Sequence, residues 1–352
     1  MKTKNIIIIL GVILISHISY LTSCFAQPDI HFSQFYMSPL TENPALAGAS
    51  YGIEGQINYK DQWKSLGTPY KTTAASVNAS FQRKKKAKAF VAGGLNFFSD
   101  KAGDSKMGTT QINLTGACHV SLDRYNKIGG GLQVGFAQRS VDYTNLTWGN
   151  QFDGKAYNSG LSSREVPGVP SYSYADVGAG VVWSYSKTTG RDNVLGNDEF
   201  KSNVGISLFH ITQPKYSFTG TDEKLKMKFV AHGNALLNVP NSTYGFAPGF
   251  MYFRQGSASE LYVGTLLRFK LNQISKYTGV KTNSSISFGG YYRSKDAVIL
   301  ALLLEYSNYA IGMSYDVNTS GLSTASASRG GFEISLRYIG AIPFIAQSSS
   351  RF

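Results

Sequence analysis

The chain has 352 residues, a formal net charge of +13 at pH 7 and only 16% charged residues, together with 37 Gly, 22 Tyr and 21 Phe. So few charges with so many aromatic residues disfavour an ordinary soluble surface and are typical of a barrel wall that contacts lipid. The basic excess could indicate nucleic acid, anionic lipid or an acidic protein surface, and an export signal at the N-terminus disfavours nucleic acid.

Residues 1–26 have the features of a secretory signal peptide. Lys2 and Lys4 precede an apolar stretch, and Ala26 ends a small-residue cleavage site. We predict cleavage after Ala26. Lipoprotein processing is the alternative, and it would leave Cys24 lipid-modified at the new N-terminus.

Residues 27–50 contain too much Pro and Asn for a spanning strand, yet they hold the aromatic side chains of Phe32, Phe35 and Tyr36. A segment of this kind ahead of the first strand fits a plug inside the barrel. It also fits a periplasmic segment that docks on a partner or packs against the barrel base. Both alternatives stay open, and we take Phe32, Phe35 and Tyr36 as candidate partner-binding residues.

Residues 51–340 repeatedly alternate apolar with small or polar residues, most clearly over Tyr309–Asn318. A helical membrane span needs ~20 consecutive apolar residues, whereas a tilted strand needs ~9–11. The longest apolar run after the leader, Ala297–Leu304, is far too short for such a helix. We therefore predict an all-β fold, a single transmembrane antiparallel β-barrel of about 14 strands in the outer membrane. The predicted strands are Tyr51–Tyr59, Thr72–Gln82, Ala89–Phe98, Gly108–Leu122, Lys127–Val141, Tyr172–Ser186, Ser202–Thr212, Leu225–Val239, Thr243–Arg254, Glu260–Leu271, Thr282–Arg293, Ala297–Tyr306, Tyr309–Asn318 and Gly331–Ile339.

The lengths of the connections predict an orientation. Outer-membrane barrels have short periplasmic turns and longer external loops. With the N-terminus in the periplasm, the odd-numbered connections face out, and they include the long segments Asp142–Ser171 and Gln213–Lys224. Short connections such as Asp123–Asn126 then face the periplasm, although Lys187–Lys201 is longer than this rule prefers.

Two connections carry further candidate partner-binding residues. Segment Asp142–Ser171 contains Trp148 and Phe152, and loops of this length are commonly functional; it either contacts a partner or caps the lumen. The basic run that contains Arg83, Lys84 and Lys85 either contacts a partner or forms a solvated hairpin turn.

Catalytic and metal-binding patterns are weak in this sequence. His31, His119, His210 and His232 are scattered, and none has a close Cys or His at metal-ligand spacing. Gly129-Gly130-Gly131 lacks the strand-to-helix context of a phosphate loop. We predict no enzymatic activity, no cofactor and no metal site.

Several motifs are spread over the mature chain: Asp29–Leu40, Asn43–Gly48, Gln62–Gly67, Phe98–Asp104, Ala137–Ser140, Trp148–Gly154, Ser314–Asn318 and Arg329–Leu336. Together they resemble the PorP/SprF family of outer-membrane proteins from the type IX secretion and gliding apparatus of Bacteroidetes. The resemblance extends from about Asp29 to Tyr338. The expected organisation is therefore a signal peptide (1–26), a periplasmic N-terminal segment or plug (27–50), a β-barrel (51–340) and an unrecognised C-terminal tail (341–352).

The resemblance implies a non-enzymatic role in protein secretion and gliding motility. The implied function is docking or anchoring of a secreted, adhesin-like cell-surface protein that carries a C-terminal sorting domain. The implied partners are this cargo, outer-membrane lipid and periplasmic type IX secretion components, including a peptidoglycan-binding protein. The alternative is an outer-membrane pore for passive or selective solute uptake, because polar inward faces could line a channel.

Overall fold

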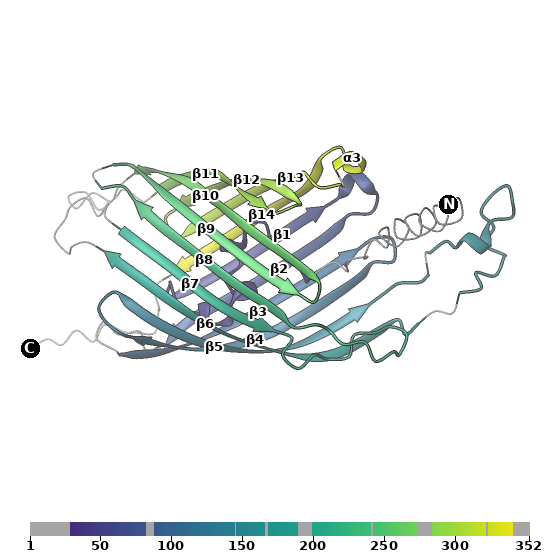
Figure 1. The fold of residues 1–352 in the computed structure, drawn as a ribbon, viewed down its shortest axis with the longest axis horizontal. Helices are drawn as coiled ribbons and strands as arrows, with labels where there is room; N and C mark the ends of the chain where they lie inside the picture. Colours follow the sequence, from purple (N-terminus) through teal and green to yellow (C-terminus); the bar gives the residue numbers. More distant parts are fainter. Residues whose placement is uncertain are drawn as a thin grey trace, which may run out of the picture.

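The computed structural model describes residues 29–81, 88–144, 146–165, 168–188, 199–240, 242–272, 284–321 and 323–340. Within these ranges, fourteen antiparallel strands form a closed barrel in which each strand pairs with its neighbours in sequence and β1 pairs with β14 (Figure 1). This confirms the predicted fold class. The strands are β1 (Ile53–Gln62), β2 (Tyr70–Phe81), β3 (Ala89–Ala102), β4 (Met107–Ser121), β5 (Asn126–Ser140), β6 (Ser171–Thr188), β7 (Glu199–Phe209), β8 (Lys228–Asn238), β9 (Tyr244–Gln255), β10 (Ala258–Asn272), β11 (Ser284–Arg293), β12 (Ala297–Tyr306), β13 (Tyr309–Asn318) and β14 (Arg329–Gly340).

Alternation along the strands separates an apolar exterior from a polar interior. On β13, the side chains of Tyr309, Ile311 and Met313 are exposed, whereas Ser314 and Asp316 are buried. The other strands repeat this arrangement because successive side chains of a strand point to opposite faces of the sheet. The exterior is therefore suited to lipid contact, and the charged and amide side chains are collected in the lumen.

The observed strand bounds agree best with the prediction where the apolar alternation is strongest. β12 and β13 begin and end at the predicted residues. β3 continues past Phe98 to Ala102, because its polar end pairs with both β2 and β4 beyond the apolar part of the wall. β7 ends at Phe209, before the predicted Thr212, since His210 adopts a positive φ of 56° that breaks the extended backbone.

The barrel has two unlike ends. The end that we call the loop end carries the connections after the odd-numbered strands, including 141–170, which contains the 3₁₀ helix η4 (Gly149–Gln151), and 210–227. Connection 141–170 extends well beyond the strands (Figure 1). Helices η3 (Lys64–Leu66) and α3 (Ser323–Ser326) also lie at the loop end. The other end, the turn end, has the short connections 122–125 and 307–308, and β1 begins there at Ile53.

Several predictions lie outside the described residues, among them the signal peptide, the C-terminal tail 341–352 and the basic residues Arg83, Lys84 and Lys85. Lys88, which follows the basic run, lies at the turn end just before β3. Among the described residues, no helix is long and apolar enough to cross a membrane.

Candidate functional site

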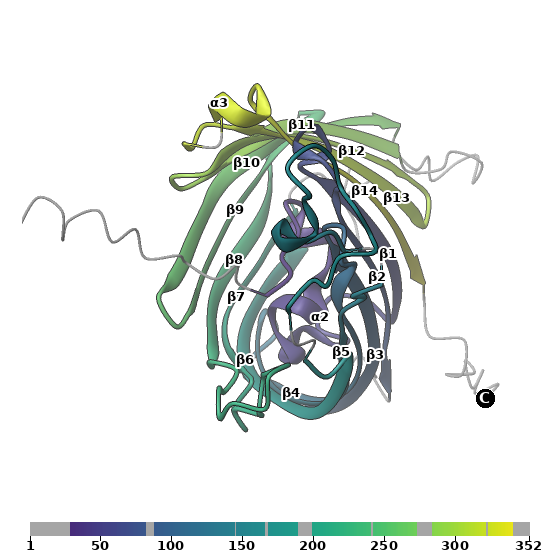
Figure 2. The same ribbon diagram turned by 90° about the vertical axis from the view of Figure 1, so that its right-hand side faces the viewer.

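The lumen of the barrel holds the segment that precedes β1, which we call the luminal segment (residues 29–52) (Figure 2). It folds as three short helices, η1 (Phe35–Met37), α2 (Pro39–Glu42) and η2 (Pro44–Leu46). Pro39 and Pro44 each occupy the first turn of a helix, where a missing backbone N–H costs nothing. Asn43 caps η2, because its side-chain oxygen accepts a hydrogen bond of 2.8 Å from the Ala45 N–H. The Pro and Asn residues that exclude a strand here therefore define these turns.

Aromatic packing anchors one part of the luminal segment to the wall. Phe35 and Met37 are buried in a cluster with Tyr262, Leu266 and Tyr291, which face inward from β10 and β11. The ring centroids of Phe35 and Tyr291 lie 5.2 Å apart in an edge-on arrangement, a favoured geometry for aromatic pairs. This contact is part of the largest apolar cluster inside the barrel among the described residues.

Wall side chains also hold the backbone of the luminal segment. The Glu333 carboxylate accepts hydrogen bonds from the N–H groups of Ser33 (2.7 Å) and Gln34 (3.0 Å). The Lys60 ammonium donates to the carbonyl of His31 at 3.0 Å. Further contacts to the segment's backbone come from Asn58, Asn78, His119, Ser207 and Lys228. Side chains from several strands therefore hold the backbone of the luminal segment at many points along its length.

Asn43 connects the middle of the segment to three strands. Its side-chain N–H groups donate to the carbonyls of Val181 (2.9 Å) on β6 and Ile206 (3.1 Å) on β7. The same nitrogen lies 3.1 Å from Nε2 of His232 on β8. The wall leaves room for this contact because residue 180 is a glycine. A Cβ on Gly180 would lie only 2.1 Å from the Asn43 side-chain oxygen. The segment and the wall are therefore fitted closely at this level.

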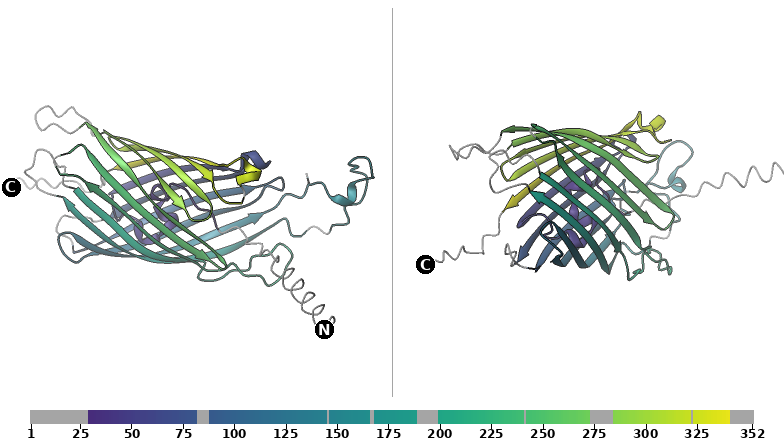
Figure 3. Two further views of the ribbon diagram at one scale, coloured as in Figure 1. Left: turned by 45° about the horizontal axis from the view of Figure 1, so that its top comes forward. Right: turned by 60° about the vertical axis from the view of Figure 1, so that its left-hand side comes forward.

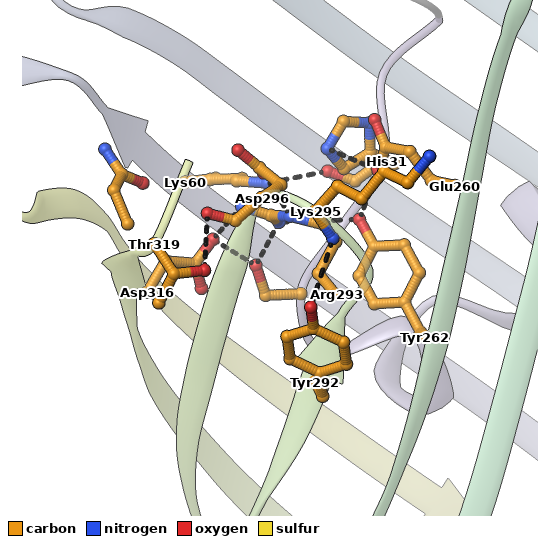
Figure 4. Close-up of polar contacts among 12 residues, drawn as sticks. His31, Lys60, Glu260, Tyr262, Tyr292, Arg293, Lys295, Asp296, Asp316 and Thr319 are labelled. Carbon is orange, nitrogen blue, oxygen red and sulfur yellow. Dashed lines mark hydrogen bonds and ion pairs between the residues drawn. The ribbon is translucent and has the colours of Figure 1, made fainter. Parts of the chain in front are cut away.

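A buried charge cluster joins the strands near the loop end (Figure 4). The Arg293 guanidinium is fully buried, and its Nη2 lies 2.9 Å from Oδ2 of Asp316. Its Nε pairs with Asp296, while Nη1 lies 3.4 Å from the Tyr262 hydroxyl. Asp316 also accepts a hydrogen bond of 2.8 Å from the Ser33 hydroxyl, so the cluster extends from β11 and β13 to the luminal segment. A buried guanidinium is tolerated only when paired in this way.

The first described residue of the luminal segment is held at the loop end. The Asp29 carboxylate pairs with Nε2 of His210, whose Nδ1 lies 3.0 Å from Oδ2 of Asp176. The Asp29 backbone N–H donates to the side chain of Gln255 at 2.9 Å. Burial alone would lower the pKa of His210, but the Asp29 and Asp176 carboxylates raise it to about 9. His210 is thus cationic at neutral pH and joins two carboxylates.

The structure separates the predicted partner-binding residues into different places. Phe32 and Phe35 are buried in the lumen, with Tyr36 beside them and partly buried. Trp148 and Phe152 lie in connection 141–170 at the loop end, and Phe152 is 59% exposed. The structure does not bring the luminal aromatic residues and the loop-end aromatic residues together. Arg83, Lys84 and Lys85 are outside the described residues.

Sequence reasoning missed most of the side chains that hold the luminal segment. The inward position of Glu333 follows from the alternation of β14, but its partners could not be predicted from that alternation. Glu333 binds the luminal segment, while Arg337 lies 3.7 Å from Glu305. Among the described residues, no cluster of three His, Cys, Asp or Glu side chains is placed to hold a metal ion.

The closed barrel, its apolar exterior and its occupied lumen define a transmembrane β-barrel of the outer-membrane type. The family model of the type IX secretion system membrane protein PorP/SprF matches residues 24–338. The chain therefore belongs to this family, as the motifs predicted. Family and fold together place it in the outer membrane as a secretion-related barrel, in a family described as membrane proteins of a secretion system and not as enzymes.

Other comparisons give only distant likenesses. No curated protein matches the chain. Similar solved structures include BamA from Haemophilus ducreyi lacking POTRA domains 1–3, with 11% identity over 81% of this chain and 69% of that one and a TM-score of 0.41. A mutant of the monoaromatic hydrocarbon channel TodX has 9% identity, coverages of 86% and 94% and a TM-score of 0.46. A FadL homologue from Pseudomonas aeruginosa has 9% identity, coverages of 85% and 98% and a TM-score of 0.42. Likeness at this level says nothing about function.

Proposed function

We propose that the barrel docks or anchors a secreted cell-surface protein that carries a C-terminal sorting domain, and that it does so at the loop end. Membership of a type IX secretion family supports a role in moving or retaining such cargo. The single structural observation that carries the proposal is connection 141–170, a structured loop that exposes apolar side chains at the loop end.

Connection 141–170 has internal structure of its own. Phe152 and Tyr157 form an isolated antiparallel bridge, and the Asn158 N–H donates to the carbonyl of Gln151 at 2.8 Å. The side chain of Gln151 reaches across to the Leu161 carbonyl at 3.3 Å. A connection with this many internal contacts presents its side chains in fixed positions, which reduces the entropy lost on binding.

This connection also exposes apolar side chains away from the lipid-facing wall. Phe152 is 59% exposed and Tyr157 52%, and Leu161 is exposed beside them. Because the connection extends past the strands at the loop end, lipid does not cover these residues as it covers the wall (Figure 1). Grouped apolar side chains outside the membrane indicate a protein-contact site.

The alternative, a solute pore, is less well supported. The luminal segment is attached to β1 (Asn58), β4 (His119), β6 (Val181) and β14 (Glu333), strands distributed around the barrel (Figure 3). An occupant attached at so many points disfavours a wide, permanently open channel. We also propose that the basic run at Arg83, Lys84 and Lys85 contacts periplasmic secretion components, including a peptidoglycan-binding protein.

The test uses a strain in which the gene is deleted and then restored as variants. Phe152→Ala combined with Tyr157→Ala should release one surface protein into the medium while the barrel keeps its heat-modifiable gel migration. Lys155→Ala, an exposed polar change in the same connection, is the matched control and should keep the surface protein attached. Impaired uptake of small solutes with an unchanged surface proteome in the deletion strain would favour the pore and overturn the docking proposal.

A further inference from the structure

The luminal segment runs through the barrel in one direction, from the loop end to the turn end. At its start, Asp29 is bound to Gln255, the last residue of β9, and to His210, directly after β7. At its finish, the Gly48 N–H donates to Asn78 at 2.9 Å and the Gly52 carbonyl accepts from Ser80 at 2.8 Å. β9 and β7 both end at the loop end, whereas Ser80 is next to the turn-end terminus of β2.

Intermediate contacts follow the same order. Ser33 binds Glu333 near the loop end, Asn43 binds Val181 near the middle of β6, and the Ala47 carbonyl lies 2.8 Å from Nε2 of His119 near the turn end of β4. The start of the segment and the start of β1 are therefore at opposite ends of the barrel.

The lengths of the connections indicate which end faces the cell surface. The two longest connections of the barrel, 141–170 and 210–227, are both at the loop end. Two-residue connections occur at both ends, 256–257 at the loop end and 307–308 at the turn end, so the two longest connections decide the orientation. Since outer-membrane barrels place long connections outside and tight turns in the periplasm, the loop end is the external end.

We propose that Asp29 lies at the cell-surface mouth of the barrel, so that the luminal segment passes inward from this mouth through the lumen to reach β1 at the periplasmic end. This proposal does not depend on the identity of the cargo.

The path of the segment has a consequence for assembly. The wall contacts of Ser33 and Asn43 involve strands far apart in sequence, so the luminal segment can make all of them only in a closed barrel.

The experiment measures labelling by a membrane-impermeant maleimide in a Cys118→Ser background that removes the lipid-facing thiol. Pro28→Cys probes the start of the segment, Lys155→Cys marks the loop end, and Arg124→Cys marks the turn end. We expect Pro28→Cys and Lys155→Cys to react on intact cells and Arg124→Cys to react only after the outer membrane is permeabilised. Heat-modifiable migration of each variant shows that its barrel is folded.

Three results would overturn the proposal. In the first, Pro28→Cys reacts only after permeabilisation, together with Arg124→Cys. In the second, Arg124→Cys reacts on intact cells and Lys155→Cys does not, which would invert the barrel. In the third, Pro28→Cys stays unreactive in folded protein under both conditions and reacts only after denaturation, which would mean that the start of the segment is enclosed and not exposed at the mouth.

Discussion

At the scale of single residues, a few inward-facing side chains of the wall bind backbone groups of the luminal segment. Glu333 accepts the adjacent N–H groups of Ser33 and Gln34, and Lys60 donates to the neighbouring carbonyl of His31. Buried backbone N–H and C=O groups need hydrogen-bond partners. The wall supplies partners for several such groups of the irregular luminal segment, which lowers the free-energy cost of burying it.

Replacement of Glu333 should loosen the start of the luminal segment. Glu333→Ala removes the two hydrogen bonds that the Ser33 and Gln34 N–H groups donate to its carboxyl oxygens, and each such bond contributes about 0.5–1.5 kcal/mol. We expect hydrogen exchange at the Ser33 and Gln34 amides to accelerate by about tenfold in detergent-solubilised protein. Glu223→Ala, a change at an exposed carboxylate in connection 210–227, is the control. Unchanged exchange at both amides would show that Glu333 does not hold the segment.

His210 makes the loop-end attachment depend on pH. Its pKa of about 9 lies above the ordinary value of 6.5, so the stability that it contributes is complete below about pH 6.5 and is lost as the pH rises through about 9. The His210 ion pair lowers the pKa of Asp29 despite its burial, so the Asp29 contribution is lost only in strong acid. The groups that face His210 are Asp29 and Asp176, with Lys228 beside Asp29.

The stability of the barrel should therefore fall between pH 6.5 and 9, by at most about 3 kcal/mol. The measurement is the denaturant midpoint of unfolding in detergent across this range. In His210→Asn, which cannot gain a proton, the decline should be absent. A decline of equal size in His210→Asn would assign the pH dependence to other groups.

At the scale of elements, the fit between wall and luminal segment depends on glycine at particular inward positions. A Cβ on Gly131 of β5 would lie 2.4 Å from the backbone nitrogen of Ala45, closer than side-chain carbons are ever found. On Gly130, the outward neighbour in the same strand, a Cβ would meet nothing within 4 Å. Gly131 therefore leaves room for η2 beside the wall, whereas Gly130 has no such role.

Gly131→Ala and Gly130→Ala form a matched pair that tests this fit. Overpacking at Gly131 should destabilise the barrel by about 1–3 kcal/mol and increase protease cleavage within residues 29–52. Gly130→Ala should be neutral or slightly stabilising, because it only restricts the unfolded chain. The readouts are the denaturant midpoint and a timed proteolysis. Equal effects of the two substitutions would mean that η2 does not press against the wall.

The elements also show what the sequence could and could not predict. The number of strands and the inward or outward direction of their side chains followed from the alternation. Tyr309 and Ile311 are exposed while Asp316 is buried, as a period of two residues requires. The end of β7 did not follow, because the positive φ of His210 has no signature in alternation. The path of residues 29–52 could not be predicted either, since contacts such as Ser33 with Glu333 join parts of the chain that only barrel closure brings together.

At the scale of the whole molecule, two surfaces meet at the loop end. One is connection 141–170, with Phe152 and Tyr157 exposed on a structured loop. The other is the start of the luminal segment at Asp29, held by His210. Because the lumen is occupied and the two longest connections of the barrel are at the loop end, we propose this end as the surface that meets a secreted partner. Membership of the family indicates a role in secretion. The exposed aromatic residues of connection 141–170 are the place where we propose that the secreted protein docks.

The central claim is that the loop end docks a secreted surface protein. Its most direct test places a photo-crosslinking amino acid at Phe152 and, as the control, at Arg124 in the turn-end connection 122–125. Irradiated cells should yield one predominant adduct at Phe152 with an exported protein that carries a C-terminal sorting domain, and no such adduct at Arg124. Recovery of that protein from Arg124 alone, or of no secreted protein from Phe152 in a folded barrel, would contradict the claim.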